Sequence, residues 1–514
     1  MEFCADGSYE CTPETAGHAG NGGDGGASQG DGGATSNGAG GEDAGFAGAD
    51  PDGGSAGLAP VAGASGDGGD AAGAAGSPDD PDDTCVPHAP VDGCRLDDET
   101  GIYVDPTNGN DAGLGTRAAP LASAERALRI ASDLGKPVYL CNAEYDERVE
   151  AADAAVALRG GYTCSEDERG AWVYAEGTSA TLRSTVPGTV LSVRDVTEFA
   201  VSDVAFYAAD AEEPGESSVA AFVASSLGVT FTRVVLRAGK AKDGADAELI
   251  PFVMPAPESL SGNPWNNGPG GAKECLCPAG DTTRGGAAGS SSLPGEDGAP
   301  DWGAGQGGLA GPCTVGNGER GGDAPTRPPG TGAPVVGQLL SDGWRPEAGE
   351  DGENGQPGQG GGGGTGSAPT PGGAAGGCGG CGGRGGPGGQ GGGGSIALAA
   401  LASEITVRNS SLEAADAGHG GDGDGGQSGQ IGGSAGTVPA GHCGGGDGGT
   451  GAAGGAGGGG AGGVSGAVLE LDSTVTTDSK TTLDVGQAGK GGLGGVPGVN
   501  DGIDGRAGDR LTLD

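Results

Sequence analysis

The chain has few of the residues that build a conventional hydrophobic core. Only 4% of its 514 residues are aromatic, and alanine inflates the hydrophobic fraction of 34%. Glycine supplies 124 residues and proline 32, together 156 of 514, or about 30%. A fraction this high is typical of low-complexity or disordered sequence. Most of the chain therefore cannot belong to one compact core.

Positive charge is also scarce. The sequence has 25 Lys and Arg against 70 Asp and Glu, which gives a formal net charge of −45. A field of this sign repels phosphate backbones and anionic membranes, and it favours solubility. Nucleic acid is therefore excluded as a partner.

Long apolar runs are missing. None approaches the roughly 18 to 20 residues that a membrane span needs, and the first residues, "MEFCADGSYECTPETAG", lack the basic segment and apolar core of a secretory signal. Either the protein is cytosolic or the true start is absent from this chain. The cysteine content favours the second interpretation, because disulfides persist in oxidising compartments. The expected location is extracellular or the outer cell surface.

Cysteine is present as an even set, compatible with disulfides. The sequence does not fix the pairing. Three pairs are interpreted as local staples: Cys85 with Cys94, Cys141 with Cys164, and Cys275 with Cys277. The "CGGCGG" stretch is typical of a local disulfide between Cys378 and Cys381, or of free thiols. The full set of disulfide candidates is Cys4, Cys11, Cys85, Cys94, Cys141, Cys164, Cys275, Cys277, Cys313, Cys378, Cys381 and Cys443.

A metal site is the alternative for that C-x-x-C pair. Zinc would accept Cys378 and Cys381 together with His419, His442 and Cys443, but the histidines lack the usual finger spacing. The "GGDGG" tracts resemble a Ca²⁺-binding repeat, yet "GDGDGGQSG" lacks the apolar position that anchors it. The sequence predicts no metal site and no cofactor.

An internal repeat is the strongest signal. "TEFAVSDVAFYA" (197–208), "LGVTFTRVVLRA" (227–238) and "SEITVRNSSLEA" (403–414) align without gaps, with apolar residues at positions three, five and ten and usually eight. Two short strands with a bend would direct these inward, and stacked copies would bury them. The predicted scaffold core is Phe199, Val201, Val204, Phe206, Val229, Phe231, Val234, Leu236, Ile405, Val407 and Leu412.

An upstream segment carries a resemblance. "YVDPTNGNDAGLGTRAAPLASAERALRIA", followed by "VYLCNAEYDERV" and "VALRGGYTC", resembles the N-terminal region of right-handed parallel β-helix proteins of the pectate-lyase-like superfamily. The resemblance implies a mostly β fold, a right-handed parallel β-helix with a short N-terminal capping helix. We place that helix between Pro120 and Gly135. The pattern is also similar to glycine-rich secreted bacterial β-helix proteins and, in composition alone, to PE-PGRS proteins.

Long glycine-rich insertions interrupt the predicted coils. Glycine recurs at every third position through 420–432, 445–463 and 486–498. This period matches an extended helix with three residues per turn. Flexible loops and polyglycine-II-like bundles both fit. The predicted divisions are an acidic disordered stalk (1–84), the β-helix start with its first coils (85–238), an insertion (239–394), a coil (395–414), an insertion (415–465), a coil (466–485), and an insertion with a final strand (486–514).

The resemblance also implies a search for carboxylates, because related enzymes cleave acidic polysaccharides. The chain has "GHG" at 418–420, but inside an insertion, and the pairs Asp79/Asp80, Asp82/Asp83 and Asp97/Asp98 precede the solenoid. General acid–base catalysis needs rigidly held carboxylates. No catalytic or cofactor-binding residue is assigned.

We therefore expect a non-enzymatic secreted or cell-surface structural or adhesion protein that presents glycine-rich projections. Its expected partners are extracellular polysaccharide or other cell-surface components. The alternative is a carbohydrate-active β-helix protein, with polysaccharide lyase or hydrolase chemistry. Five charged residues distinguish the two functions. If they share one groove, the enzyme is favoured, and if they are scattered, the structural protein is favoured: Arg194, Asp203, Arg233, Arg237 and Arg408. Ice or mineral-surface binding is a third possibility, by analogy alone.

Overall fold

The computed structural model describes residues 85, 90–96, 99–152, 156–164, 172–366 and 372–513. These residues belong to one compact unit, Gly76–Asp514. The predicted stalk, both cysteines before Cys85 and the three Asp pairs lie outside the described residues. Within the described part, no helix has the length and apolar character needed to cross a membrane.

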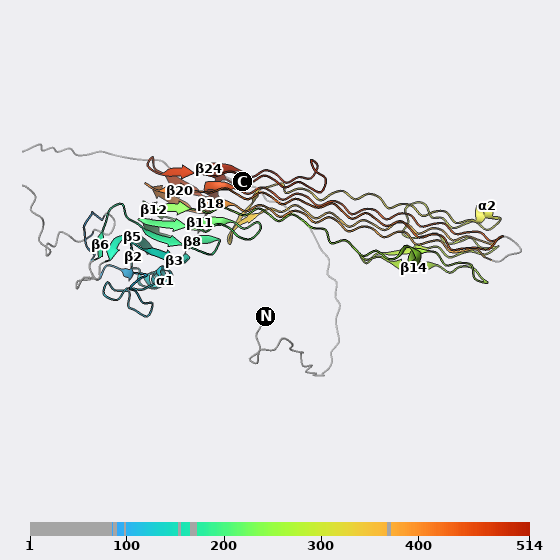
Figure 1. Ribbon diagram of the computed structural model, residues 1–514, viewed down its shortest axis with the longest axis horizontal. Helices are drawn as coiled ribbons and strands as arrows, with labels where there is room; N and C mark the ends of the chain where they lie inside the picture. Colours follow the sequence, from blue (N-terminus) through green and yellow to red (C-terminus); the bar gives the residue numbers. More distant parts are fainter. Residues whose placement is uncertain are drawn as a thin grey trace, which may run out of the picture. The chain divides into compact units, whose positions relative to one another are not determined.

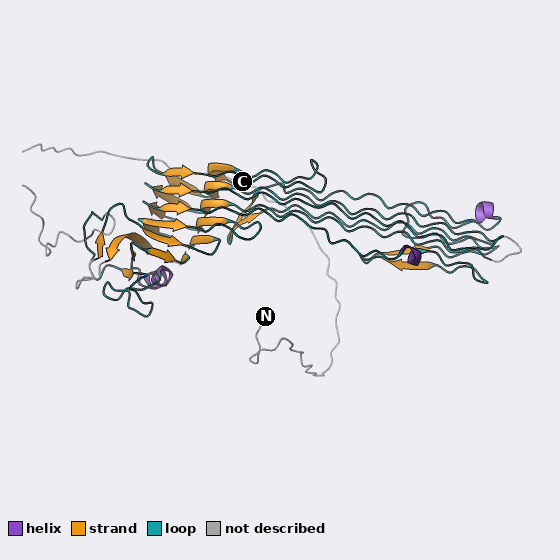
Figure 2. Cartoon of the chain, in the orientation of Figure 1, coloured by secondary structure: helices purple, strands orange, loops and turns teal. Residues whose placement is uncertain are grey.

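Three sheets of parallel strands form a β-solenoid-like fold (Figures 1 and 2). The chain visits them in a fixed order, so each coil contributes one strand to each sheet. Sheet 1 contains β1 (Ile102–Val104), β2 (Val138–Cys141), β5 (Val156–Cys164), β9 (Phe199–Ser202), β12 (Val229–Thr232), β19 (Glu404–Arg408) and β22 (Thr474–Thr477). A short strand, β6 (Trp172–Tyr174), adds antiparallel to β5.

The other two sheets contain one strand from each successive coil. Sheet 2 contains β3 (Glu144–Asp146), β7 (Ala180–Arg183), β10 (Val204–Tyr207), β13 (Val235–Arg237), β20 (Ser411–Glu413) and β23 (Thr482–Asp484). Sheet 3 contains β4 (Val149–Ala152), β8 (Thr189–Arg194), β11 (Ser218–Ala224), β18 (Ser395–Leu401), β21 (Ser465–Leu471) and β24 (Ala507–Thr512).

Equivalent positions of the sequence repeat stack on one another. Val229 pairs with Phe199 on one side and with Ile405 on the other, and Leu236 lies between Phe206 and Leu412. All eleven predicted core residues belong to one buried cluster, each at most 2% exposed. Alternation within each strand turns these side chains inward, where each coil covers the next.

One helix, α1 (Ala124–Leu134), contacts β1, β2, β4 and β5. It begins four residues after Pro120, later than the sequence pattern suggested, because Leu121 still bonds to Tyr103 in extended structure. The Ser123 hydroxyl accepts the Arg126 N–H at 3.0 Å, and Gly135 ends the helix with φ of 62°. Both are standard capping devices, and the buried face of α1 joins the solenoid core.

From β8 to β22, two of the three corners of each coil are tight. Between sheets 1 and 2 the chain turns through Asp203, Arg233 and Asn409, whose φ angles are 57°, 54° and 47°. The corner between sheets 3 and 1 uses the same left-handed conformation at Asp195, Ser225, Ala402 and Asp472. Non-glycine residues seldom adopt it, so its recurrence in successive coils shows that the tight corners are built alike. The third corner, from sheet 2 to sheet 3, is different.

Candidate functional site

All three glycine-rich segments leave the solenoid at this third corner. They join β13 to β18 (238–394), β20 to β21 (414–464) and β23 to β24 (485–506). We call their described residues the glycine bundle. Because the coils are stacked, the segments start one above another and extend side by side (Figure 1). The predicted insertions thus share one origin.

The first segment contains regular structure as well. Two antiparallel hairpins interrupt its extended tracts, and both were missed in the sequence: β14 (Lys273–Leu276) with β15 (Thr282–Gly285), and β16 (Gly337–Leu340) with β17 (Gly343–Pro346). Two single turns of helix also occur, η2 (Pro257–Leu260) and α2 (Cys313–Gly316).

Backbone hydrogen bonds join the tracts at every third residue. From 349 to 364, every third N–H donates to a carbonyl between 389 and 374, at 2.8–2.9 Å. That second tract donates with the same step to carbonyls of 446–458, at 2.8–3.0 Å. The third tract donates in turn to carbonyls of 362–350, at 2.8–2.9 Å. These three tracts therefore form a ring of donors and acceptors. A fourth tract, 424–433, joins it by donating to carbonyls of 387–378 and by accepting from every third N–H of 448–457.

The threefold glycine period is a packing requirement. A Cβ atom on Gly379, Gly382 or Gly385 would lie 1.8 Å from a carbonyl oxygen of the tract 352–358. Real Cβ atoms essentially never approach a neighbour more closely than 3.0 Å. Only glycine allows the backbones to come this close, so its spacing in the sequence follows the faces on which the tracts meet.

Acidic and amide side chains complete the hydrogen bonding at the rim of the bundle. Asp422 accepts the Leu493 N–H at 2.6 Å, and Asp246 accepts the Asp422 N–H at 2.8 Å. Asn354 accepts the Gly385 N–H at 2.9 Å. Each of these side-chain oxygens accepts a backbone N–H that, inside the bundle, would bond to a carbonyl of a neighbouring tract. Part of the acidic excess in the sequence is therefore structural.

Asp323 illustrates the electrostatics of the rim. Its carboxylate accepts from Arg320 at 2.6 Å and from the Thr450 N–H at 2.7 Å. The Arg320 contact, followed by the Thr450 N–H, lowers the pKa of Asp323 below its ordinary value. The charged form is thus favoured in the folded bundle.

A column of buried serines lies at the root of the bundle, which is the end where its segments leave the solenoid. Ser218, Ser395 and Ser465 begin three successive strands of sheet 3, and all three are 0% exposed. The Ser395 hydroxyl donates to the Gly239 carbonyl and accepts the Ala415 N–H, both at 2.8 Å. The other two serines bridge the coils beside them in the same way. Each hydroxyl therefore ties together the outgoing chains of two successive coils.

We did not single out these serines from the sequence. The signal was present, because a serine precedes the apolar strand in both "SSVAAFVASS" and "GSIALAALAS". The residue type alone does not tell a buried serine from an exposed one. The serine at the start of each sheet 3 strand stands out only when the sequences of the coils are aligned.

Five disulfides occur among the described residues. Cys85–Cys94 and Cys141–Cys164 pair locally, as interpreted from the sequence. The local pairings Cys275–Cys277 and Cys378–Cys381 are wrong. The bridges instead are Cys275–Cys378, Cys277–Cys381 and Cys313–Cys443, across 103, 104 and 130 residues. The reason is that β14 lies against the returning tract, where Cys378 and Cys381 face it.

The possible zinc ligands do not come together. Cys378, Cys381 and Cys443 are all in disulfides. His419 uses Nδ1 to accept the Lys490 N–H at 2.8 Å, and Nδ1 of His442 lies 2.8 Å from the Gly372 carbonyl oxygen. In the described part of the chain, no group of three or more His, Cys, Asp and Glu side chains could hold a metal ion.

The charged residues chosen to test for an enzyme lie on different faces. Arg194 is on sheet 3, Arg237 on sheet 2 and Arg408 on sheet 1. Arg233 forms a bidentate pair with Asp203, both bonds at 2.6 Å, at the corner between sheets 1 and 2. The Asp203 side chain is 4% exposed. These five residues therefore do not share one groove.

Comparison with models of known protein families and with curated protein sequences finds no match to this chain. The parallel strands in stacked sheets are compatible with a parallel β-helix.

Proposed function

We propose that this protein is a non-enzymatic extracellular or cell-surface structural protein that serves in attachment. In this proposal the solenoid is a right-handed parallel β-helix of the pectate-lyase-like type, capped by α1. The glycine bundle is a polyglycine-II-like arm that holds an attachment surface away from it. The single observation that carries the proposal is that three segments leave one corner and unite in one hydrogen-bonded bundle.

The position of the disulfides supports an arm that must stay intact. Three of the five bridges join parts of the glycine bundle to each other. The hairpin β14–β15 and α2, to which these bridges belong, lie toward the end of the bundle away from the solenoid (Figure 1). The solenoid anchors one end through its serines and strands, and covalent bonds hold the other. Such bonds persist outside the cell, which agrees with the proposed location.

The enzyme alternative has less support. Arg233 and Asp203 are engaged with each other, and Arg237 bonds to Glu413 at 2.6 Å. Charged side chains that pair with one another across neighbouring coils are not free to act on a substrate, whether or not the pair adds stability. The scattered positions of the five residues therefore favour the structural protein.

The test is the location of the native protein. An antibody against the solenoid should label intact cells or their secreted matrix, and fractionation should recover the protein there with its cysteines oxidised. Recovery only from the cytosol, with reduced cysteines, would remove the proposal.

A further inference from the structure

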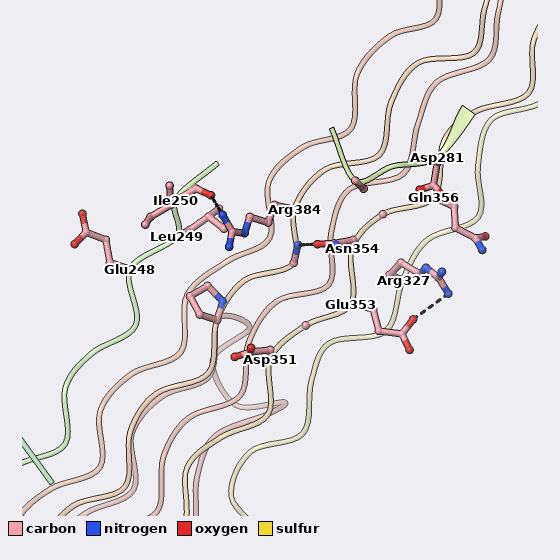
Figure 3. Close-up of a pocket in the computed structure, with 15 residues that line it drawn as sticks. Glu248, Leu249, Ile250, Asp281, Arg327, Asp351, Glu353, Asn354, Gln356 and Arg384 are labelled. Atoms are coloured by element: carbon pink, nitrogen blue, oxygen red, sulfur yellow. Dashed lines mark hydrogen bonds and ion pairs between the residues drawn. The ribbon is translucent and has the colours of Figure 1, made fainter. Parts of the chain in front are cut away.

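A polar groove crosses one side of the glycine bundle. It has a volume of about 770 Å³ and is formed by four separate stretches of chain: 248–250, the hairpin turn at 279–281, the tract 351–356, and 384–387, with Arg327 at its wall. Figure 3 shows the side chains of these stretches around one hollow. This volume lies in the range of small-molecule sites.

The two arginines of the groove already have partners. Arg327 pairs with Glu353 at 3.0 Å. Arg384 donates to the Ile250 carbonyl at 2.8 Å and lies over the Phe252 ring, 5.5 Å from its centroid. Both positive charges are thus held in the wall (Figure 3).

Three carboxylates of the groove have no positive partner among the described residues: Glu248, Asp281 and Asp351. One carboxylate oxygen of Asp351 accepts the Gly388 N–H at 2.8 Å, which fixes the orientation of the Asp351 side chain. Asn354 is likewise oriented by the Gly385 N–H and keeps its amide NH₂. The groove lining has four carboxylates against two arginines, so it offers acceptors with a net negative charge, beside an amide donor.

An aromatic side chain extends the groove. A second hollow of about 430 Å³ shares Asp281 and Gln356 with the first, and Trp302 lines it. The Trp302 indole is half-buried and donates to the Pro357 carbonyl at 3.0 Å, which fixes the ring. A fixed indole face attracts both apolar C–H surface and ammonium groups.

We propose that these two adjoining hollows together bind an amino-sugar oligosaccharide. Ammonium groups would pair with Glu248, Asp281 and Asp351, and sugar hydroxyls would bond to Asn354 and Gln356. A ring face would stack on Trp302. An acidic glycan is excluded by the unbalanced carboxylates and by the net charge of the protein. The inference rests on the proposed attachment function and gives it a ligand class.

The experiment measures binding of four fluorescent probes to the purified full-length protein by anisotropy. The probes are hexamers of β-1,4-linked glucosamine, glucose and α-1,4-linked galacturonate, and hexalysine. The decisive variant is Glu248→Gln/Asp281→Asn, whose exposed side chains make no bond that the fold needs. The matched control is Glu404→Gln/Asp509→Asn, two exposed carboxylates on the solenoid.

We expect the glucosamine hexamer to bind more tightly than the other three probes. The groove variant should weaken it about tenfold or more, since it removes two charged hydrogen-bond acceptors, and the control should not. Failure of glucosamine binding, equal binding of hexalysine or galacturonate, or equal loss in the control would overturn the inference. A failed binding experiment would not change whether the antibody labels the cell surface. Conversely, an intracellular location of the protein would not change the measured binding of the glucosamine hexamer. The two proposals therefore fail separately.

Discussion

Gly382 lies so close to the Gly355 carbonyl oxygen that a Cβ atom on it would be only 1.8 Å away. The contact joins two tracts of the glycine bundle that are also linked by the hydrogen bond from the Gly355 N–H to the Gly383 carbonyl, at 2.8 Å. Such close backbone contacts show that the tracts of the bundle pack against one another.

We expect Gly382→Ala to push these tracts apart and to expose amides on both sides. An added methyl group in a packed interior costs about 1–3 kcal/mol, and more where backbone cannot move. Hydrogen exchange should show faster exchange at Gly355 and Gly358, whose N–H groups donate to the Gly383 and Gly380 carbonyls across this contact. The matched control is Gly425→Ala, where a Cβ would meet nothing within 4 Å. Equal protection in the two variants would contradict the packed bundle.

The serine column gives a second prediction. Ser395→Ala would leave the Gly239 carbonyl and the Ala415 N–H without their shared partner in a fully buried place. The free energy of unfolding should fall by about 1–3 kcal/mol, measured by denaturant titration. Ser291→Ala, at an exposed serine, should leave it unchanged. A Ser395 variant as stable as the wild type would show that the hydroxyl does not hold the root.

The two neighbouring bridges should behave non-additively. Cys275–Cys378 and Cys277–Cys381 close nearly the same loop, of 103 and 104 residues. A loop of this length corresponds to about 4–5 kcal/mol in the chain-entropy account, but the remaining bridge supplies most of it when one is removed. We expect small losses from Cys277→Ser/Cys381→Ser and a large one only when all four cysteines are serine. Hydrogen exchange of β14 and β15 reports the difference, and additive losses would contradict it.

Acid should open the rim before the interior. The pKa of Asp323 is lowered in the folded protein, so its stabilising effect is complete above the ordinary value of 3.8 and is lost as pH falls through the lower folded value. The protection factor of the Thr450 amide, corrected for its intrinsic rate, should fall in that range. The Gly377 amide donates to a backbone carbonyl and should keep its protection. In Asp323→Ala, Thr450 should be weakly protected at every pH.

The sequence was most informative at positions where a single structural requirement determines which residue type can occur. Val229 and Ile405 could be assigned to a core because inward positions of stacked coils repeat. Gly426 belongs to a threefold period recognised in the sequence, which fits both extended tracts in contact and an open loop. Choosing between them needs the neighbouring tract, which lies far away in sequence.

Other features were beyond sequence reasoning for the same reason. Cys275 is two residues from Cys277, but its partner is set by how a missed hairpin docks on a tract 103 residues later. Leu121 continued the helical pattern of α1, yet its bonds belong to an extended segment beside Tyr103. In both cases a contact across the fold overrides a local pattern.

The shared corner from which the three segments leave has a consequence for variation in length. An outgoing tract and its returning neighbour bond at every third residue, so a matched pair of triplets can be inserted or deleted while the remaining bonds keep their alignment. Each such triplet changes the span by about 9 Å, from a rise of about 3.1 Å per residue. The protein can therefore become longer or shorter by discrete steps while its coils remain unchanged.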